Sequence, residues 1–152
     1  MAFATSTSWF PKTLAKEQAG TVNFAGSTKK IMILTAIPTG FEEFIDDLTE
    51  LSASGYASGY GNSGRKTMAG TFTFADNDDG ETTLTYSTTV EWASLGTNES
   101  VKGFVILTET GGADTSSIPW IWLPVADGTY VLSGATQTLT LPSPIMTHRL
   151  AS

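Results

Sequence analysis

The sequence predicts a mainly β fold: an antiparallel β-sandwich or jelly-roll-like domain with one short inserted helix and an extended N-terminal arm. Apolar and polar residues alternate with period two over residues 68–92, and short apolar runs follow at fairly regular spacing. Serine, threonine and glycine are abundant, while charged residues make up only 15% of the chain. This composition favours strands and turns.

The first third of the chain is expected to contain a short helix and two strands. Pro11 stands near the start of a stretch that ends at Gly20, and proline at the start with glycine at the end is typical of one or two helical turns. Residues 21–25 and 30–35 follow, and their apolar content predicts strands.

A second, amphipathic helix is expected over residues 41–51. Thr39 and Glu42 have the spacing of a capping box, and apolar residues then recur at helical spacing. Packing of these apolar residues must hold the helix, since carboxylates three and four positions apart repel one another on its outer face. The expected core contacts are Phe41, Phe44, Ile45 and Leu48, and the outer carboxylates are Glu43, Asp46, Asp47 and Glu50.

The remainder is expected to be β-structure in one domain. Residues 68–92 predict a hairpin that turns at residues 76–80. Further strands are predicted at residues 101–107, 118–125, 130–132 and 136–141, with turns at Gly111-Gly112, Asp127-Gly128 and Ser133-Gly134. The predicted organisation is an N-terminal arm (1–19), the sandwich (20–142) and a C-terminal tail (143–152).

Charge and composition exclude several classes of function. A net charge of −7 argues against nucleic-acid binding, which needs cations to replace the counterions of phosphates. Cysteine is absent, so disulfides and thiolate metal sites are excluded. Apolar runs fall short of the roughly 20 residues of a membrane span, and the N-terminus does not resemble a signal peptide. We therefore expect no membrane partner and synthesis in a cytoplasm.

Residues 59–67 imitate a phosphate-binding loop. Arg65 displaces the Lys-Thr pair of that motif, and the residues that follow alternate like a strand, whereas the motif needs a helix at this point. We therefore interpret residues 54–64, called the Gly-Tyr loop below, as a flexible loop or one ordered by a partner.

Two acidic stretches invite a metal-binding interpretation. In residues 76–81 the spacing departs from that of an EF-hand loop, and a plain hairpin turn is favoured, with a weak calcium site as the alternative. The carboxylates of residues 43–50 are expected to be solvated, to hold a hard cation, or to meet a basic strip on another subunit, where they would steer association.

Candidates for catalysis are few. His148 is the single histidine and lies in the predicted tail, and no activated serine arrangement is present. Paired carboxylates remain open because spacing alone does not place them. We predict that the protein is not an enzyme and uses no cofactor.

Aromatic residues are the best candidates for contacts with a partner. Trp120 and Trp122 are predicted to lie on one face of a strand whose other face is also apolar, which suits either the core or a partner surface. Aromatic side chains on polar segments are typical binding hot spots. The predicted partner-contact residues are Trp9, Phe10, Tyr56, Tyr60, Asn62, Arg65, Trp120 and Trp122.

Six short segments occur in an order that resembles a group of small β-rich structural proteins of tailed bacteriophage virions. They are 30–35 (KIMILT), 46–48 (DDL), 54–56 (SGY), 90–92 (VEW), 102–106 (KGFVI) and the closing Ser133-Gly134 strand, so that the match covers roughly residues 29–141. Two features depart from the pattern: the loop lacks an adjacent glycine pair, and Lys102-Gly103 replaces an Arg-aromatic step.

The resemblance implies a capsid decoration, or cement, protein on the virion surface. Its expected partners are the major capsid protein and, as a homotrimer, further copies of itself, and its role would be to stabilise the shell. The alternative is a structural protein of the tail or fibre that binds a host glycan through Tyr56, Tyr60 and Asn62.

Overall fold

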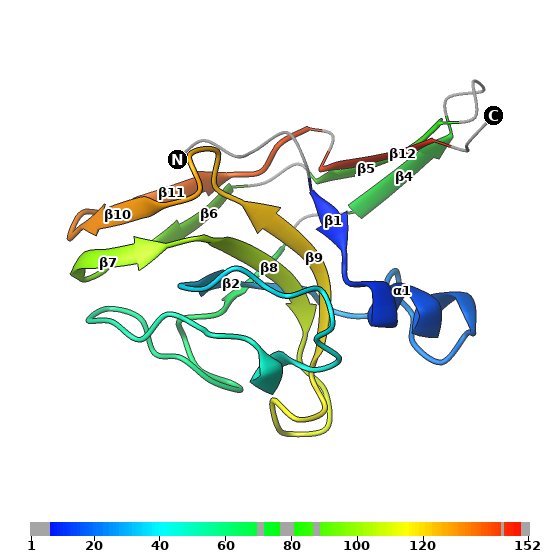
Figure 1. The fold of residues 1–152 in the computed structure, drawn as a ribbon, viewed down its shortest axis with the longest axis horizontal. Coiled ribbons are helices and arrows are strands. Elements are labelled where there is room, and N and C mark those ends of the chain that lie inside the picture. The colour runs from blue at the N-terminus through cyan, green and yellow to red at the C-terminus, as the bar shows by residue number, and fades with distance from the viewer. Residues whose placement is uncertain (1–6, 70–71, 77–80, 87–88, 144, 150–152) are drawn as a thin grey trace.

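A computed structural model of the chain describes residues 7–69, 72–76, 81–86, 89–143 and 145–149 (Figure 1). The predicted mainly β fold is confirmed. The helices are α1 (Pro11–Gln18) and the 3-10 turn η1 (Ile45–Asp47). The strands are β1 (Ser8–Trp9), β2 (Lys30–Leu34), β3 (Lys66–Thr67), β4 (Phe72–Asp76), β5 (Glu81–Tyr86), β6 (Thr89–Trp92), β7 (Thr97–Val101), β8 (Gly103–Thr108), β9 (Ile118–Pro124), β10 (Tyr130–Ser133), β11 (Gln137–Thr140) and β12 (Met146–Arg149).

A five-stranded antiparallel sheet forms the centre of the molecule, in the order β1-β9-β8-β2-β3. Its middle strands are apolar on both faces, as expected of a sheet covered on both sides. All six residues of β8 are buried.

A second layer is built from antiparallel pairs, in which β5, β6 and β7 pair with β12, β11 and β10 respectively. β4 pairs with β5 and confirms the predicted hairpin, whose turn at residues 77–80 lies outside the described residues. The two layers give a sandwich-like arrangement, and its finer jelly-roll topology stays a prediction.

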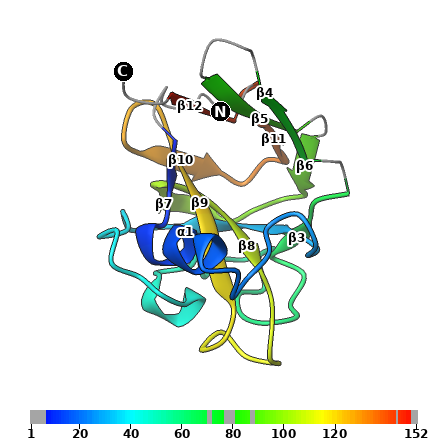
Figure 2. The ribbon, with the colours of Figure 1, turned by 90° about the vertical axis from the view of Figure 1, so that its right-hand side faces the viewer.

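Two clusters of buried side chains lie on opposite faces of the central sheet. Ile31 and Ile33 belong to the larger cluster, which includes residues of the second layer, while Met32 and Leu34 belong to the smaller one. Side chains alternate along a strand, so the two clusters must lie on opposite faces. The smaller cluster is completed by Phe10 and Ile45, and Figure 2 shows α1 and the η1 segment away from the second layer.

The predicted helix over residues 41–51 is wrong, since only η1 is helical there. The Glu42 carboxylate accepts hydrogen bonds from the N–H groups of Thr39 and Gly40, so the capping contact exists without a helix behind it. Residues 49–51 run beside β2, where the Leu51 N–H donates to the Ile33 carbonyl (2.9 Å). These contacts satisfy the backbone in an extended conformation.

Three other expectations are also corrected. Residues 7–19 are part of the domain and not an extended arm, because β1 pairs with β9 and the Phe10 side chain is 2% exposed. The predicted tail contains β12, whose backbone pairs with β5. Residues 21–25 form bends and turns, not a strand, and Phe24 N–H bonds the Glu17 carboxylate.

Candidate functional site

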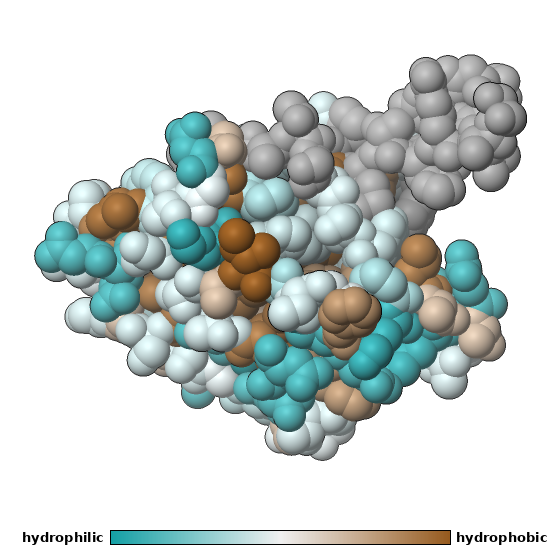
Figure 3. All heavy atoms as spheres, viewed as in Figure 1, coloured by the Kyte–Doolittle hydropathy of each residue, from teal (hydrophilic) through white to brown (hydrophobic). Residues whose placement is uncertain are grey.

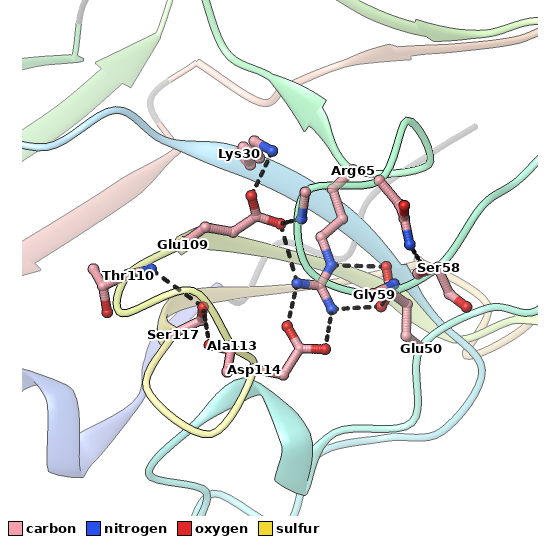
Figure 4. Close-up of polar contacts among 12 residues, drawn as sticks. Lys30, Glu50, Ser58, Gly59, Arg65, Glu109, Thr110, Ala113, Asp114 and Ser117 are labelled. Carbon is pink, nitrogen blue, oxygen red and sulfur yellow. Dashed lines mark hydrogen bonds and ion pairs between the residues drawn. The ribbon is translucent and has the colours of Figure 1, made fainter.

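A buried arginine organises the most polar site of the described structure (Figure 4). Arg65 directly follows the Gly-Tyr loop, and its side chain is 1% exposed. The guanidinium forms paired hydrogen bonds with Glu50 (3.0 and 2.6 Å) and with Asp114 (2.6 and 3.0 Å). It also donates to Glu109 at 3.2 Å. These four residues, with Lys30, which pairs with Glu109 at 2.5 Å, are called the Arg65 cluster below.

Arg65 is held in its charged form. Burial alone would lower the pKa of Arg65, but hydrogen bonds and opposite charges from Glu50 and Asp114 raise that pKa above its usual value. Two cations face three carboxylates, so the charges nearly cancel. The arrangement uses the planar guanidinium to bridge two carboxylates with paired bonds, which a lysine cannot do.

Tyr56 extends the cluster into the core. Its hydroxyl donates to Glu50 (2.8 Å) and accepts from the Ile33 N–H (3.2 Å), and the residue is 5% exposed. Burial, followed by the charge of Glu50, raises the pKa of this phenol above its usual range. Tyr56 is therefore a neutral structural group that ties the loop to β2.

Further hydrogen bonds fix the backbone of the Gly-Tyr loop. The Gly59 N–H donates to Glu50 (3.0 Å) and the Gly61 N–H to Glu109 (3.1 Å). The Gly64 carbonyl accepts from the indole of Trp92 (2.6 Å). The loop that resembled a phosphate cradle thus directs its N–H groups at carboxylates of its own chain, and it leads into β3, as expected for a strand and not a helix.

Large apolar side chains are exposed on a different part of the surface, in the segment after β2. Ile37 is 64% exposed and Phe41 is 77% exposed. Beside them lies a small half-open pocket of about 120 Å³, lined by Ser8, Trp9, Phe10, Pro11, Pro38, Thr39, Gly40 and Trp122. Figure 3 shows hydrophobic residues breaking the polar surface where this segment crosses in front of the sheet.

A β-bulge separates the two tryptophans of β9. Ile121 pairs with Ile106, but Leu107 pairs with Pro119, so Trp120 has no directly opposite residue. Trp120 belongs to the larger core cluster, while Trp122 packs against the smaller one. The prediction that both lie on one face is therefore wrong.

The structure divides the predicted partner-contact residues into two groups. Phe10, Tyr56, Arg65 and Trp120 are at most 5% exposed, so these four are corrected from surface contacts to core or cluster residues. The other four are at least partly accessible: Tyr60 is 38% exposed, Asn62 is exposed, and Trp9 and Trp122 are half-buried beside the pocket.

The acidic residues do not form one face. Glu43 pairs with Lys16 (2.7 Å), Glu50 belongs to the Arg65 cluster, and Asp47 accepts from the Glu43 N–H (3.1 Å). Within the described part of the chain, no group of three histidine, cysteine, aspartate or glutamate residues is arranged to hold a metal ion. Most of the alternative calcium segment, residues 77–80, and the side chain of His148 lie outside the description.

Sequence reasoning missed the partners of Arg65. Glu50 follows η1, whereas Glu109 and Asp114 belong to the β8–β9 connection and lie 44 and 49 positions from Arg65. The single available signal was an arginine directly after an uncharged glycine-rich loop. The pocket was also missed, because its lining comes from segments far apart in the sequence, residues 8–11, 38–40 and 122.

Comparisons with known proteins identify no relative: a scan against family models and searches of curated proteins and of solved structures each find no match. Among the described residues, no helix has the length and apolar character needed to cross a membrane.

Proposed function

We propose that this protein is a structural subunit of a tailed-phage virion: a capsid decoration protein that binds the outer surface of the shell formed by the major capsid protein. The class of protein is inferred from six short segments that resemble, in the same order, those of small structural proteins of tailed-phage virions. The geometry of the Arg65 cluster supports a structural role.

The Arg65 cluster is the observation that supports a structural role best. Its guanidinium bonds three carboxylates of the same chain, and Tyr56 is held neutral. Groups that neutralise one another in this way position a loop and are not poised to react with a substrate. The cluster therefore serves to present the turn at Tyr60 and Asn62 as a fixed surface.

We assign the contact with the shell to this turn. Tyr60 combines an exposed ring with a hydroxyl, a residue type that is enriched at binding hot spots. The loop backbone is ordered before binding, so a partner would not have to offset the entropy of ordering it. Binding to the shell would stabilise both components by mass action.

Co-sedimentation with expanded shells that lack the protein tests the proposal. We expect the full-length protein to sediment with these shells and to raise their resistance to heat. Tyr60→Ser should weaken binding by about tenfold, corresponding to about 1.4 kcal/mol, while Val131→Ser serves as the control on an exposed residue of β10. The absence of wild-type protein from the shell pellet would refute the proposal.

Glycan binding on a tail or fibre remains the second proposal, for one reason. Tyr60 and Asn62 are both accessible in the same turn, although Asn62 already donates to the Ser58 carbonyl (2.5 Å) and Tyr56 is buried. A glycan array distinguishes the two proposals. Binding to a defined glycan that Tyr60→Ser abolishes, without binding to shells, would favour this second role.

A further inference from the structure

Two loops meet at one end of the central sheet. Figure 1 and Figure 2 both show the loop that joins β8 to β9, residues 109–117, beside the Gly-Tyr loop and below the sheet. The Gly61 N–H donates to the carboxylate of Glu109 (3.1 Å). Arg65 donates to Asp114 through two bonds (2.6 and 3.0 Å). The two loops are therefore parts of one surface, called the two-loop surface below.

Hydrogen bonds within the β8–β9 loop fix its shape. The buried Ser117 hydroxyl accepts from the Thr110 N–H (3.2 Å) and donates to the Ala113 carbonyl (2.8 Å). The Ser116 hydroxyl donates to the Thr110 carbonyl (2.6 Å). Gly111 has a φ of 65°, and a Cβ at this position would overlap the Ser116 hydroxyl, so the loop needs a glycine there. Both loops are thus ordered before a partner arrives, which lowers the entropy cost of binding.

The charged side chains of the two-loop surface are neutralised within the chain. Glu109 and Asp114 have side chains that are 9% and 27% exposed, and both bond the buried Arg65. In a chain of net charge −7, residues 54–64 and 109–117 are all described and include no charged residue that is classed as exposed. The surface that a partner meets is therefore polar but of low charge. Its exposed residues include Tyr60, Asn62, Ser63, Gly111, Gly112 and Thr115.

This composition is typical of loops that bind folded proteins. Antibody binding loops are rich in tyrosine, serine, glycine and asparagine, because tyrosine provides rigid contact area and the small polar residues provide adaptable hydrogen bonds. We propose that the two-loop surface recognises a folded protein face of low charge, with Thr115 in the same contact as Tyr60. This assignment rests on the proposed function and names the kind of shell face that is bound. A sugar is less suited, because the Asn62 amide beside Tyr60 already donates to the Ser58 carbonyl (2.5 Å).

The low charge of the surface predicts how binding responds to salt. Salt screens interactions between exposed charges, and the charged groups of this surface already pair within the chain. The dissociation constant of the complex with expanded shells should therefore change by less than about twofold between about 0.05 M and about 0.5 M salt. A contact made by the acidic remainder of the chain would instead weaken markedly over this range.

Co-sedimentation of the full chain with expanded shells at several protein concentrations provides the test. Thr115→Arg places a cation on the β8–β9 loop, where it would be buried without a partner, so binding should weaken by at least about tenfold. Thr140→Arg makes the same change at an exposed threonine of β11, in the second layer, and should leave the dissociation constant unchanged. Thermal unfolding by circular dichroism should show that both variants fold, since both threonines are exposed.

The possible results separate this assignment from the proposed function. If wild type binds shells and Tyr60→Ser weakens binding, but Thr115→Arg binds as wild type does, the β8–β9 loop is not part of the contact and the assignment is overturned, while the proposed function stands. A dissociation constant that rises more than about tenfold with salt overturns the low-charge partner face. Binding to a defined glycan that Thr115→Arg abolishes assigns the surface to a sugar. Wild-type protein that stays out of the shell pellet refutes the proposed function, and the assignment with it.

Discussion

The guanidinium of Arg65 and the carboxylate of Glu50 form paired hydrogen bonds, with Nε to Oε1 at 3.0 Å and Nη2 to Oε2 at 2.6 Å. This pair joins the end of the Gly-Tyr loop to the segment that follows η1. Asp114 accepts from the same guanidinium from the β8–β9 connection. One side chain thereby joins three segments, and the Tyr56 hydroxyl and the Gly59 N–H add further bonds from the loop to Glu50.

Replacing Arg65 with methionine should destabilise the protein strongly. The substitution leaves Glu50, Glu109 and Asp114 close together without their shared cation, and breaking such a buried group costs about 3 to 5 kcal/mol. Urea unfolding measures the change, and Lys66→Met, at the neighbouring half-buried position, is the matched control. A loss below about 1 kcal/mol would show that the cluster contributes little to folding.

Lys29 predicts a pH dependence at alkaline pH. Lys29 is 3% exposed, and its ammonium group donates to the Ser27 carbonyl and hydroxyl (2.7 Å each) and lies over the ring of Phe24 (4.4 Å). Burial lowers the pKa of Lys29 from 10.5 to about 8, opposed in part by the charge of Glu17. Between these two values the unfolded chain binds a proton that the native protein does not, so native stability rises with pH in this window.

The comparison of wild type with Lys29→Met isolates that contribution. The difference in the free energy of unfolding, wild type minus variant, should increase as pH rises from about 8 to about 10.5, and should be constant between about pH 6 and 7. Denaturant titrations at several pH values provide the measurement. A difference that is flat or decreases through the alkaline window contradicts this account of Lys29.

The hydrogen bonds of Glu42 predict that the stability of the native protein decreases at acidic pH. Burial alone would raise the pKa of its carboxylate, but hydrogen bonds from the N–H groups of Glu42, Thr39 and Gly40 and from the Thr39 hydroxyl lower it below the ordinary 4.5. The resulting stabilisation is present above the unfolded pKa near 4.5 and is lost as pH falls through the lower native pKa. The same bonds hold the turn that presents Phe41.

Glu42→Gln should therefore cost about 1 to 2 kcal/mol at neutral pH, because an amide accepts these bonds more weakly than a carboxylate. It should also reduce the loss of stability on acidification. Acid titration followed by circular dichroism tests both points, with the exposed Glu91→Gln as control. Equal acid sensitivity of Glu42→Gln and wild type would exclude the proposed role of the carboxylate.

Many of the strands were predictable because their signal is local, although β1, β3, β7 and β12 were not predicted as strands. Alternation over residues 68–92 reflects the two-residue period of side chains on a sheet, and the apolar runs at β2, β8 and β9 reflect strands that are covered on both faces. The turns at Gly128 and Gly134 were also predictable, since both glycines adopt positive φ (72° and 80°) that other residues disfavour.

The errors arose where contacts that the residue pattern does not reveal determined the structure. Residues 41–51 have helical spacing, but the carboxylates of Glu42 and Asp47 accept hydrogen bonds from nearby backbone N–H groups. Residues 49–51 instead run along the edge of β2 and form backbone hydrogen bonds there. The alternation of side chains predicted Trp120 and Trp122 on one face of the strand, because a β-bulge is not visible in the sequence pattern. The partners of Arg65 were not predictable, since Glu109 and Asp114 meet it through the fold alone.

Gly103 gives a prediction that connects the core with the pocket. It opens β8, and a Cβ added there would overlap the indole of Trp122 and the carbonyl oxygen of Leu123. The backbone oxygen cannot rotate away, so Gly103→Ala should force the β8–β9 pair apart and cost at least about 2 kcal/mol. Gly26→Ala is the matched control, because its Cβ would meet the amide end of the exposed Asn23 side chain, which can turn away at the cost of one exposed hydrogen bond from the Gly26 N–H (3.1 Å). Because Trp122 lines the pocket, Gly103→Ala should also change tryptophan fluorescence, whereas Gly26→Ala should leave the fluorescence unchanged. A stable Gly103→Ala protein with unchanged fluorescence would mean that β8 and β9 approach less closely at this position than the structure indicates.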